Sequence, residues 1–258
     1  MPQLQNHIQH YTADAELFDY FVEASPLESD GSRRLHEAVL RAAALPGTGM
    51  VLDAGSGNGW LAASSMDREV RIVSVDIGLR NLQEIRRRVP GALTVRADLA
   101  RLPFRTGCFT RIVSAEVLEH TNDPAAVMRE LAMTLAPGGR IVISTPYREN
   151  IRLSLCIHCN RPTPVNAHLH AFDERAHRAL FQSCGLDVLR ERRLFSKVFL
   201  MSRISYAFRF LPFSIWSFID RCFLALSGNA SMLISAGQPS RTRALPTEPS
   251  SFNPVDTR

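Results

Sequence analysis

The chain has 258 residues, of which 45% are apolar and 21% are charged, and its formal net charge is +5. This length predicts one α/β domain with additions, and the apolar content is high enough to form a full core, which excludes a wholly disordered chain. Its five cysteines, an odd number, favour a reducing compartment over a disulfide scaffold. The first residues lack the pattern of a secretory signal, so a cytoplasmic protein is expected.

Residues 1–45 predict a helical N-terminal cap. The segment 15–22 is amphipathic, and the segment 35–45 has a clear helical pattern that stops at Pro46 and Gly47.

The next segment, residues 50–66, is the most informative part of the chain. A buried strand leads into a loop with a glycine at every second position, at Gly55, Gly57 and Gly59, and a helical pattern follows from residue 61. Glycine allows positive φ and close approach of the backbone to a ligand, and the N–H groups at a helix start point toward the loop. The segment therefore predicts a nucleotide-binding site.

Two features separate this loop from the dinucleotide fingerprint. Trp60 stands where the third glycine would fall, and Asp53 precedes the loop, where its carboxylate would repel a pyrophosphate. The loop therefore favours a cationic nucleoside without phosphates.

The segment 53–59 resembles motif I of the Rossmann-like S-adenosylmethionine-dependent methyltransferases. Further segments match this family in its order: 71–76, 95–99, 102–104, 111–120 and 135–144. The resemblance implies a Rossmann-like, seven-stranded, mostly parallel sheet with helices on both faces and an antiparallel last strand. It places strands six and seven at 185–194 and 231–236. The methyltransferase domain would span 46–238, and 239–258 would form a disordered tail.

The resemblance also implies which residues bind the cofactor. Asp76 would accept hydrogen bonds from both ribose hydroxyls, while Asp98 would take the adenine amine and Leu99 would pack the ring. The N-terminal cap would close over the cofactor with Tyr11 on that side, although helices that only cover a sheet edge explain the pattern as well. The expected cofactor-binding residues are Asp53, Gly55, Ser56, Gly57, Gly59, Asp76, Ile77, Asp98, Leu99 and Ala115.

The segment 116–120 supplies candidate catalytic residues. Glu116, Glu119 and His120 have the spacing of one helical face and could bind a divalent ion such as Mg²⁺ or Zn²⁺. The segment resembles the metal-assisted small-RNA 2′-O-methyltransferases and the ubiquinone-pathway O-methyltransferases. In the former a downstream histidine completes the site, which makes His170 the preferred fourth ligand and His168 the second choice. Without a metal, His120 would act as a general base or position the acceptor with Glu116, or be structural.

A second metal hypothesis uses the same histidines. Cys156 and Cys159 form a C-x₂-C pair, which His168 and His170 could complete as a zinc site, although the spacing is not that of a zinc finger. Cysteines in an apolar loop without a metal are the simpler alternative.

Residues 195–230 form an apolar insertion between the last two expected strands. It is rich in Phe and Leu, with Lys197, Arg203, Arg209 and Arg221 between them, and it holds no uncharged run long enough to span a membrane. One interpretation is a cap packed on the domain or on a second subunit. The other is a peripheral membrane contact or a pocket for a lipid-like acceptor. Nucleic acid is disfavoured because the arginines are scattered.

The family resemblance implies transfer of a methyl group from S-adenosylmethionine to a small-molecule or lipid-like acceptor, at an oxygen atom. The sulfonium already activates the methyl group, so the enzyme mainly supplies proximity, orientation and a base. The alternative is a non-catalytic S-adenosylmethionine-binding homologue or accessory subunit, which would bind the cofactor without turnover. A third hypothesis is an enzyme that uses the same nucleoside for other chemistry.

Overall fold

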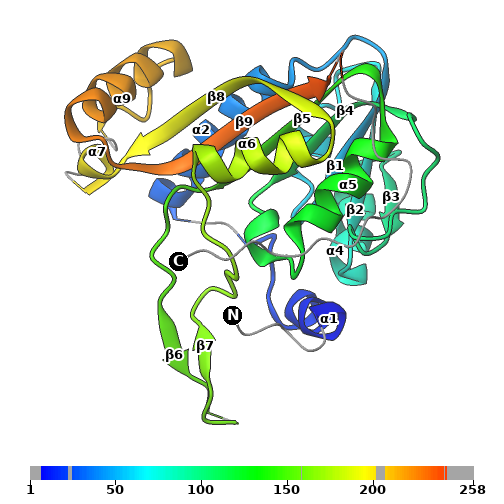
Figure 1. The fold of residues 1–258 in the computed structure, drawn as a ribbon, viewed down its shortest axis with the longest axis horizontal. Helices are drawn as coiled ribbons and strands as arrows, with labels where there is room; N and C mark the ends of the chain where they lie inside the picture. Colours follow the sequence, from blue (N-terminus) through cyan, green and yellow to red (C-terminus); the bar gives the residue numbers. More distant parts are fainter. Residues whose placement is uncertain (1–6, 23–24, 158, 202–206, 241, 243–258) are drawn as a thin grey trace.

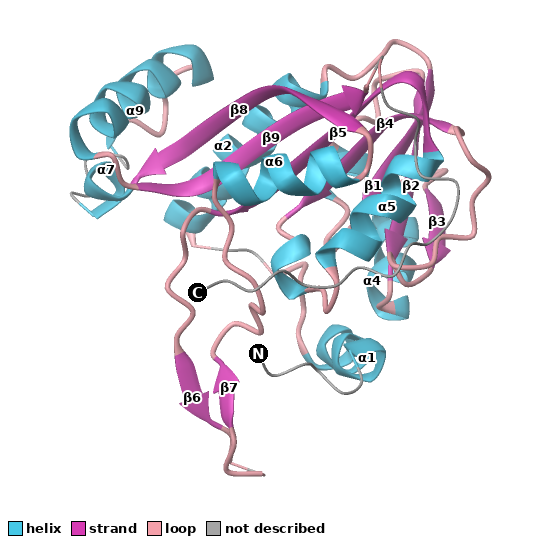
Figure 2. Cartoon of the chain, viewed as in Figure 1, coloured by secondary structure: helices cyan, strands magenta, loops and turns pink. Residues whose placement is uncertain are grey.

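A computed structural model describes residues 7–22, 25–157, 159–201, 207–240 and 242. Most of the expected tail, 239–258, lies outside these residues, and so does Arg203 of the insertion. Figures 1 and 2 show one central sheet with helices on both faces and a long hairpin that extends away from it.

The sheet has seven strands in the order β3-β2-β1-β4-β5-β9-β8. Strands β1 to β5 run parallel, and β9 is antiparallel to both of its neighbours. The expected fold is therefore confirmed, including the antiparallel last strand. The bounds are β1 Gly49–Ala54, β2 Val70–Asp76, β3 Leu93–Arg96, β4 Phe109–Ala115, β5 Leu135–Pro146, β8 Leu186–Ser196 and β9 Ala230–Pro239.

Two apolar clusters hold the helices against opposite faces of the sheet. One contains side chains of α2 and α9, and the other contains side chains of α5 and α6. Burial of these apolar surfaces is the main stabilising contribution of the core. The helices are α1 His7–Leu17, α2 Pro26–Ala43, α3 Trp60–Ala63, α4 Leu79–Arg88, α5 Pro124–Thr134, α6 Glu174–Ser183, α7 Lys197–Met201 and α9 Phe213–Ser227, with a 3₁₀ turn η1 at Leu118–His120.

The two N-terminal helices differ from the expected ranges. The backbone N–H of Phe21 donates to the Asp19 side chain at 2.9 Å, and α1 already ends at Leu17, so a helix over 15–22 is wrong. Helix α2 begins earlier than expected because Ser25 and Glu28 form a capping box around its first turn.

The insertion packs on the domain. The side chains of Phe213 and Trp216 are 4% and 1% exposed and join the same cluster as Phe195 and Phe199. They therefore occupy the core, as the cap interpretation requires. In the described part of the chain, no helix combines the length and apolar character that crossing a bilayer needs.

The hairpin of β6 (Leu153–Leu155) and β7 (Pro162–Pro164) leaves the domain after β5. Figure 1 shows it projecting beyond the carboxyl ends of the parallel strands, on the side where α1 also lies. These strand ends, together with α1, enclose the cavity described next.

Candidate active site

The glycine loop after β1 has the left-handed backbone that its sequence predicts. Gly55, Gly57 and Gly59 have φ values of 77°, 49° and 72°. A Cβ at Gly55 or Gly59 would lie 2.5 Å or 2.6 Å from a neighbouring side chain, whereas one at Gly57 would meet nothing within 4 Å. Gly57 also lines the cavity. The absence of a side chain at Gly55 and Gly59 thus allows the loop to pack closely, and the open space beside Gly57 leaves room for a ligand.

Asp76 stands at the tip of β2 beside this loop. Its two carboxylate oxygens accept hydrogen bonds from the backbone N–H groups of Gly57 and Gly78, both at 2.8 Å. Burial raises the pKa of Asp76, and these hydrogen bonds oppose that rise. The carboxylate is therefore fixed at the cavity wall, with lone pairs left for a ligand's hydroxyls.

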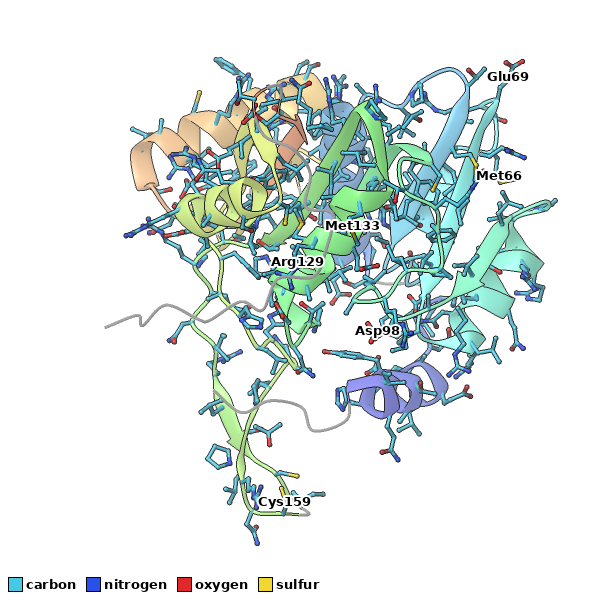
Figure 3. All side chains as sticks on the ribbon, turned by 45° about the vertical axis from the view of Figure 1, so that its right-hand side comes forward. Met66, Glu69, Asp98, Arg129, Met133 and Cys159 are labelled. Carbon is cyan, nitrogen blue, oxygen red and sulfur yellow. The ribbon has the colours of Figure 1, made fainter. Side chains whose placement is uncertain are left out.

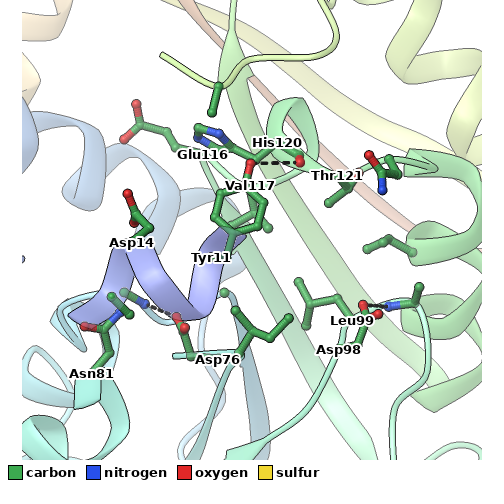
Figure 4. Close-up of a pocket in the computed structure, with 18 of the residues that line it drawn as sticks. Tyr11, Asp14, Asp76, Asn81, Asp98, Leu99, Glu116, Val117, His120 and Thr121 are labelled. Carbon is green, nitrogen blue, oxygen red and sulfur yellow. Dashed lines mark hydrogen bonds between the residues drawn. The ribbon is translucent and has the colours of Figure 1, made fainter. Parts of the chain in front are cut away.

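Helix α1 forms one wall of the cavity. The Tyr11 hydroxyl donates to the backbone oxygen of His120 at 3.0 Å, and Ala15 lies against Gly78, where an added Cβ would approach within 2.4 Å. The first helix of the expected cap thus borders the site, with Tyr11 lining it, whereas α2 packs on a face of the sheet. Figure 4 shows Tyr11 between Asp76 on one side and His120 on the other.

The cavity has a volume of about 410 Å³, and its lining is acidic. It contains five carboxylates and no Lys or Arg among the described residues that line it. The carboxylates are Asp14, Asp76, Asp98, Glu116 and Asp123. Such a lining repels phosphates and attracts cations. S-adenosylmethionine carries a sulfonium and an ammonium group and no phosphate, so the residues present fit this cofactor.

Six of the ten expected cofactor residues line the cavity, namely Gly55, Gly57, Asp76, Ile77, Asp98 and Leu99. The other four, Asp53, Ser56, Gly59 and Ala115, are not among the lining residues. Asp53 is 2% exposed beneath the loop, and burial raises its pKa to about 7. The nearby carboxylate of Asp76, which lines the cavity, adds to this rise, and contact of Asp53 with the cofactor stays a prediction. Asn81 and Asn166 line the cavity without having been expected.

Glu116 and His120 line the opposite end of the cavity. Glu116 directly follows β4 and has a φ of 56°, in the left-handed region. This conformation is energetically costly for a residue with a side chain, and residues that adopt it are often found at functional sites. Burial raises the pKa of Glu116, whereas burial lowers the pKa of His120 to about 4, so His120 is neutral near pH 7.

Glu119 precedes His120 in the turn η1 and is not among the residues that line the cavity. Its side chain is 1% exposed, and neither carboxylate oxygen has a hydrogen-bond partner. Burial raises its pKa to about 8. Burying a charged carboxylate without a hydrogen-bond partner costs free energy, which a bound cation or a proton would offset.

A second histidine completes a compact cluster with Glu119. Ligand atoms of Glu119, His120 and His168 all lie within 4.8 Å of one another. The Nδ1 of His168 is hydrogen-bonded to the Glu149 carboxylate. A carboxylate on the second ring nitrogen is the usual partner of a metal-binding histidine. Glu149 was not expected from the sequence.

The cluster contains His168 and not His170, the preferred fourth ligand. The His170 Nε2 donates to the backbone oxygen of Thr121 at 2.9 Å, and His170 does not join the cluster. Glu116 is likewise absent from it and faces the cavity instead.

The cysteine pair does not meet these histidines. Figure 3 shows Cys159 at the tip of the β6–β7 hairpin, away from Asp98 in the cavity. Within the described residues, the cluster of Glu119, His120 and His168 is the one group of three possible metal ligands, so a zinc site built from Cys156, Cys159, His168 and His170 is not formed.

Comparison with known proteins places the chain in a family. Residues 27–191, more than half of the chain, match the family model described as a methyltransferase domain. The chain therefore belongs to this family, the class I S-adenosylmethionine-dependent methyltransferases.

Relatives with assigned names are similar over part of the chain. A probable S-adenosylmethionine-dependent methyltransferase of Mycolicibacterium smegmatis is 29% identical over 60% of this chain and 59% of its own length. A ubiquinone biosynthesis O-methyltransferase of Xanthomonas oryzae is 29% identical over 42% of this chain and 47% of its own length. The chain thus spans roughly half the length of these relatives.

Solved structures support the fold. A methyltransferase of Mesorhizobium loti has a TM-score of 0.54 at 21% identity and covers 78% of this chain and 95% of its own. The [4+2]-cyclase SpnF has a TM-score of 0.60 at 13% identity and covers 91% of this chain and 94% of its own. At these identities the likeness concerns the fold alone.

Proposed function

We propose that this chain transfers the methyl group of S-adenosylmethionine to a hydroxyl oxygen of a small-molecule or lipid-like acceptor. The observation that carries the proposal is the acidic cavity between the glycine loop and Glu116, which suits a cationic nucleoside. Two relatives support the acceptor class by their names, a ubiquinone biosynthesis O-methyltransferase and a demethylmenaquinone methyltransferase.

The cofactor-binding half of the site consists of residues with distinct roles. Asp76 accepts hydrogen bonds from the ribose hydroxyls, Asp98 accepts one from the adenine amine, and Leu99 packs against the ring. Tyr11 and the rest of α1 exclude water from their side of the cavity. A drier site strengthens the attraction between the carboxylates and the sulfonium.

His120 and Glu116 meet the acceptor at the other end of the cavity. Methyl transfer forms a bond between the acceptor oxygen and the methyl carbon and releases S-adenosylhomocysteine, while the hydroxyl proton must leave. The neutral imidazole of His120 can take this proton, and the Glu116 carboxylate can orient the hydroxyl.

We further propose that Glu119, His120 and His168 hold a divalent cation, Mg²⁺ or Zn²⁺. The support is the pair of buried oxygens of Glu119 without partners and the carboxylate of Glu149 on His168. A cation there would lower the pKa of the acceptor hydroxyl and fix its position. His120 would then be a ligand, and Glu116 would be left as the base.

The proposal is tested with radiolabelled S-adenosylmethionine and a fractionated cell extract. Label should appear in a small-molecule or lipid fraction with the wild type and not with Gly57→Val. Cofactor binding without transfer to any fraction would favour the non-catalytic alternative. For the cation, elemental analysis of protein purified without chelator should find one ion per chain, and a chelator should abolish transfer. Absence of a bound ion together with chelator-insensitive transfer would reject the cation and leave His120 as the base.

A further inference from the structure

Helix α9 of the insertion is apolar on two sides. One side, with Phe213, Trp216 and Leu224, is buried against the domain. The other side is exposed and carries Ile215, Phe218 and Leu226, which are 49%, 61% and 86% exposed. Figure 1 shows α9 at the outer end of the molecule beside β8, the edge strand of the sheet.

The exposed residues form one continuous face. A helix turns by 100° per residue, so Ile215, Phe218, Cys222 and Leu226 lie within one stripe along the axis. Phe210, just before the helix, is 81% exposed as well and lies beside α2. We call Ile215, Phe218 and Leu226 the apolar face of α9.

The exposed charges of the insertion itself have one sign, although Asp30 and Glu37 of α2 lie in the same hollow as Arg209 and Phe210. Asp220 is the single acidic residue in the sequence 195–230. Its side chain is fully buried and accepts hydrogen bonds from the backbone N–H groups of Phe195 and Ser196. Arg221 and Lys197 are exposed, and the Arg209 guanidinium lies 4.5 Å from the centre of the Phe210 ring. The described surface of the insertion is therefore apolar and cationic.

This combination distinguishes between possible partners. A second copy docked face to face would bring Arg221 of each chain toward the same cationic patch, because a symmetric dimer uses the same surface twice. Like charges would then meet. The surface of an anionic lipid bilayer supplies both negative headgroups for the cations and an apolar layer for the aromatic side chains.

We propose that the apolar face of α9 docks on the surface of an anionic membrane. The buried side of the helix stays packed on the domain, so the face is presented without unfolding of the cap. The proposal concerns this surface alone and does not depend on the identity of the methyl acceptor.

The test is sedimentation of the full chain with vesicles of phosphatidylcholine, with and without phosphatidylglycerol, at low and high salt. The wild type should bind the anionic vesicles at low salt, bind less at high salt because salt screens the cations, and bind pure phosphatidylcholine weakly. Phe218→Ser with Leu226→Ser should weaken binding by about 100-fold, since each large apolar side chain removed from water favours the bound state roughly tenfold. Arg221→Glu should weaken it by about fivefold or more.

A matched control separates this face from general exposure of apolar side chains. Leu155 and Ile157 on the hairpin are 64% and 88% exposed, close to the values of Phe218 and Leu226. Leu155→Ser with Ile157→Ser should leave vesicle binding unchanged, and both double variants should keep the wild-type melting midpoint. Failure of the wild type to bind anionic vesicles, or equal loss in both double variants, would overturn the proposal. A solution dimer that is lost only in the Phe218→Ser, Leu226→Ser variant would assign the face to a second copy instead.

Discussion

Glu119→Gln should make the protein more stable and less active. The native carboxyl group is buried without a hydrogen-bond partner, and burial raises its pKa from 4.5 to about 8. Glutamine has nearly the same shape and is neutral at every pH. Replacement therefore removes the free-energy cost of ionising a buried carboxyl group. It also removes the carboxylate that we propose as a cation ligand.

The size and sign of the effect follow from the two pKa values. A carboxyl whose pKa is higher in the folded state favours folding below the unfolded pKa and loses that contribution as pH rises toward the folded pKa. Wild type and Glu119→Gln should thus be equally stable below pH 4.5 and diverge up to pH 8. At 1.36 kcal/mol per pKa unit, the variant should gain up to about 3 kcal/mol at pH 7 and about 5 kcal/mol above pH 8. Relaxation of the interior around the ionised group would reduce these upper values.

The assay is urea unfolding of metal-free protein across pH, with Glu69→Gln, an exposed site, as the control. A divalent cation should then stabilise the wild type and leave Glu119→Gln nearly unchanged, because the variant lacks the one anionic ligand of the cluster. A variant less stable than the wild type at pH 8, or one with full methyl-transfer activity, would refute the reasoning.

Three further predictions concern binding and stability. Asp76→Ala should weaken S-adenosylmethionine binding by about 1.5–3 kcal/mol, the scale of a lost hydrogen bond to a charged group. Gly57→Val should abolish binding because its side chain would fill the open space beside that carboxylate. Wild-type affinity of both variants in calorimetry would exclude both roles. Trp216→Ala should lower the free energy of unfolding by about 3–5 kcal/mol because the ring is buried, and a melting midpoint equal to that of the wild type would place it outside the core. His177 is hydrogen-bonded to Thr145 and Ser235, and burial lowers its pKa from 6.5 to about 4. Protonation of the unfolded chain should therefore lower the free energy of unfolding by about 3 kcal/mol as pH falls from 6.5 to 4. Unfolding of His177→Gln should lack this part of the acid sensitivity.

The sequence predicts the fold and the cofactor loop well because their signals are local. A strand followed by closely spaced glycines leaves few alternatives, and Asp76 at the next strand end follows from the same pattern. The burial of Asp53 could not be predicted in this way, since both faces of β1 are covered and the sequence does not show how deep below the loop its last residues lie.

The acceptor end depends on contacts that are distant in sequence. His168 and His170 are two residues apart and look equivalent in the sequence, and the hydrogen bond between His168 and the distant Glu149 distinguishes them in the structure. The same holds for α9, which is apolar on both sides. The sequence grouped Phe213 with Trp216 but could not tell that this side is the buried one and that Phe218 is on the exposed side.

The central claim is that the acidic cavity binds a cationic nucleoside, and a competition between two cofactors tests it most directly. Isothermal titration of the full chain should show one S-adenosylmethionine bound per chain and no heat of binding for NAD, whose pyrophosphate the carboxylates repel. Binding of NAD without binding of S-adenosylmethionine would contradict the account.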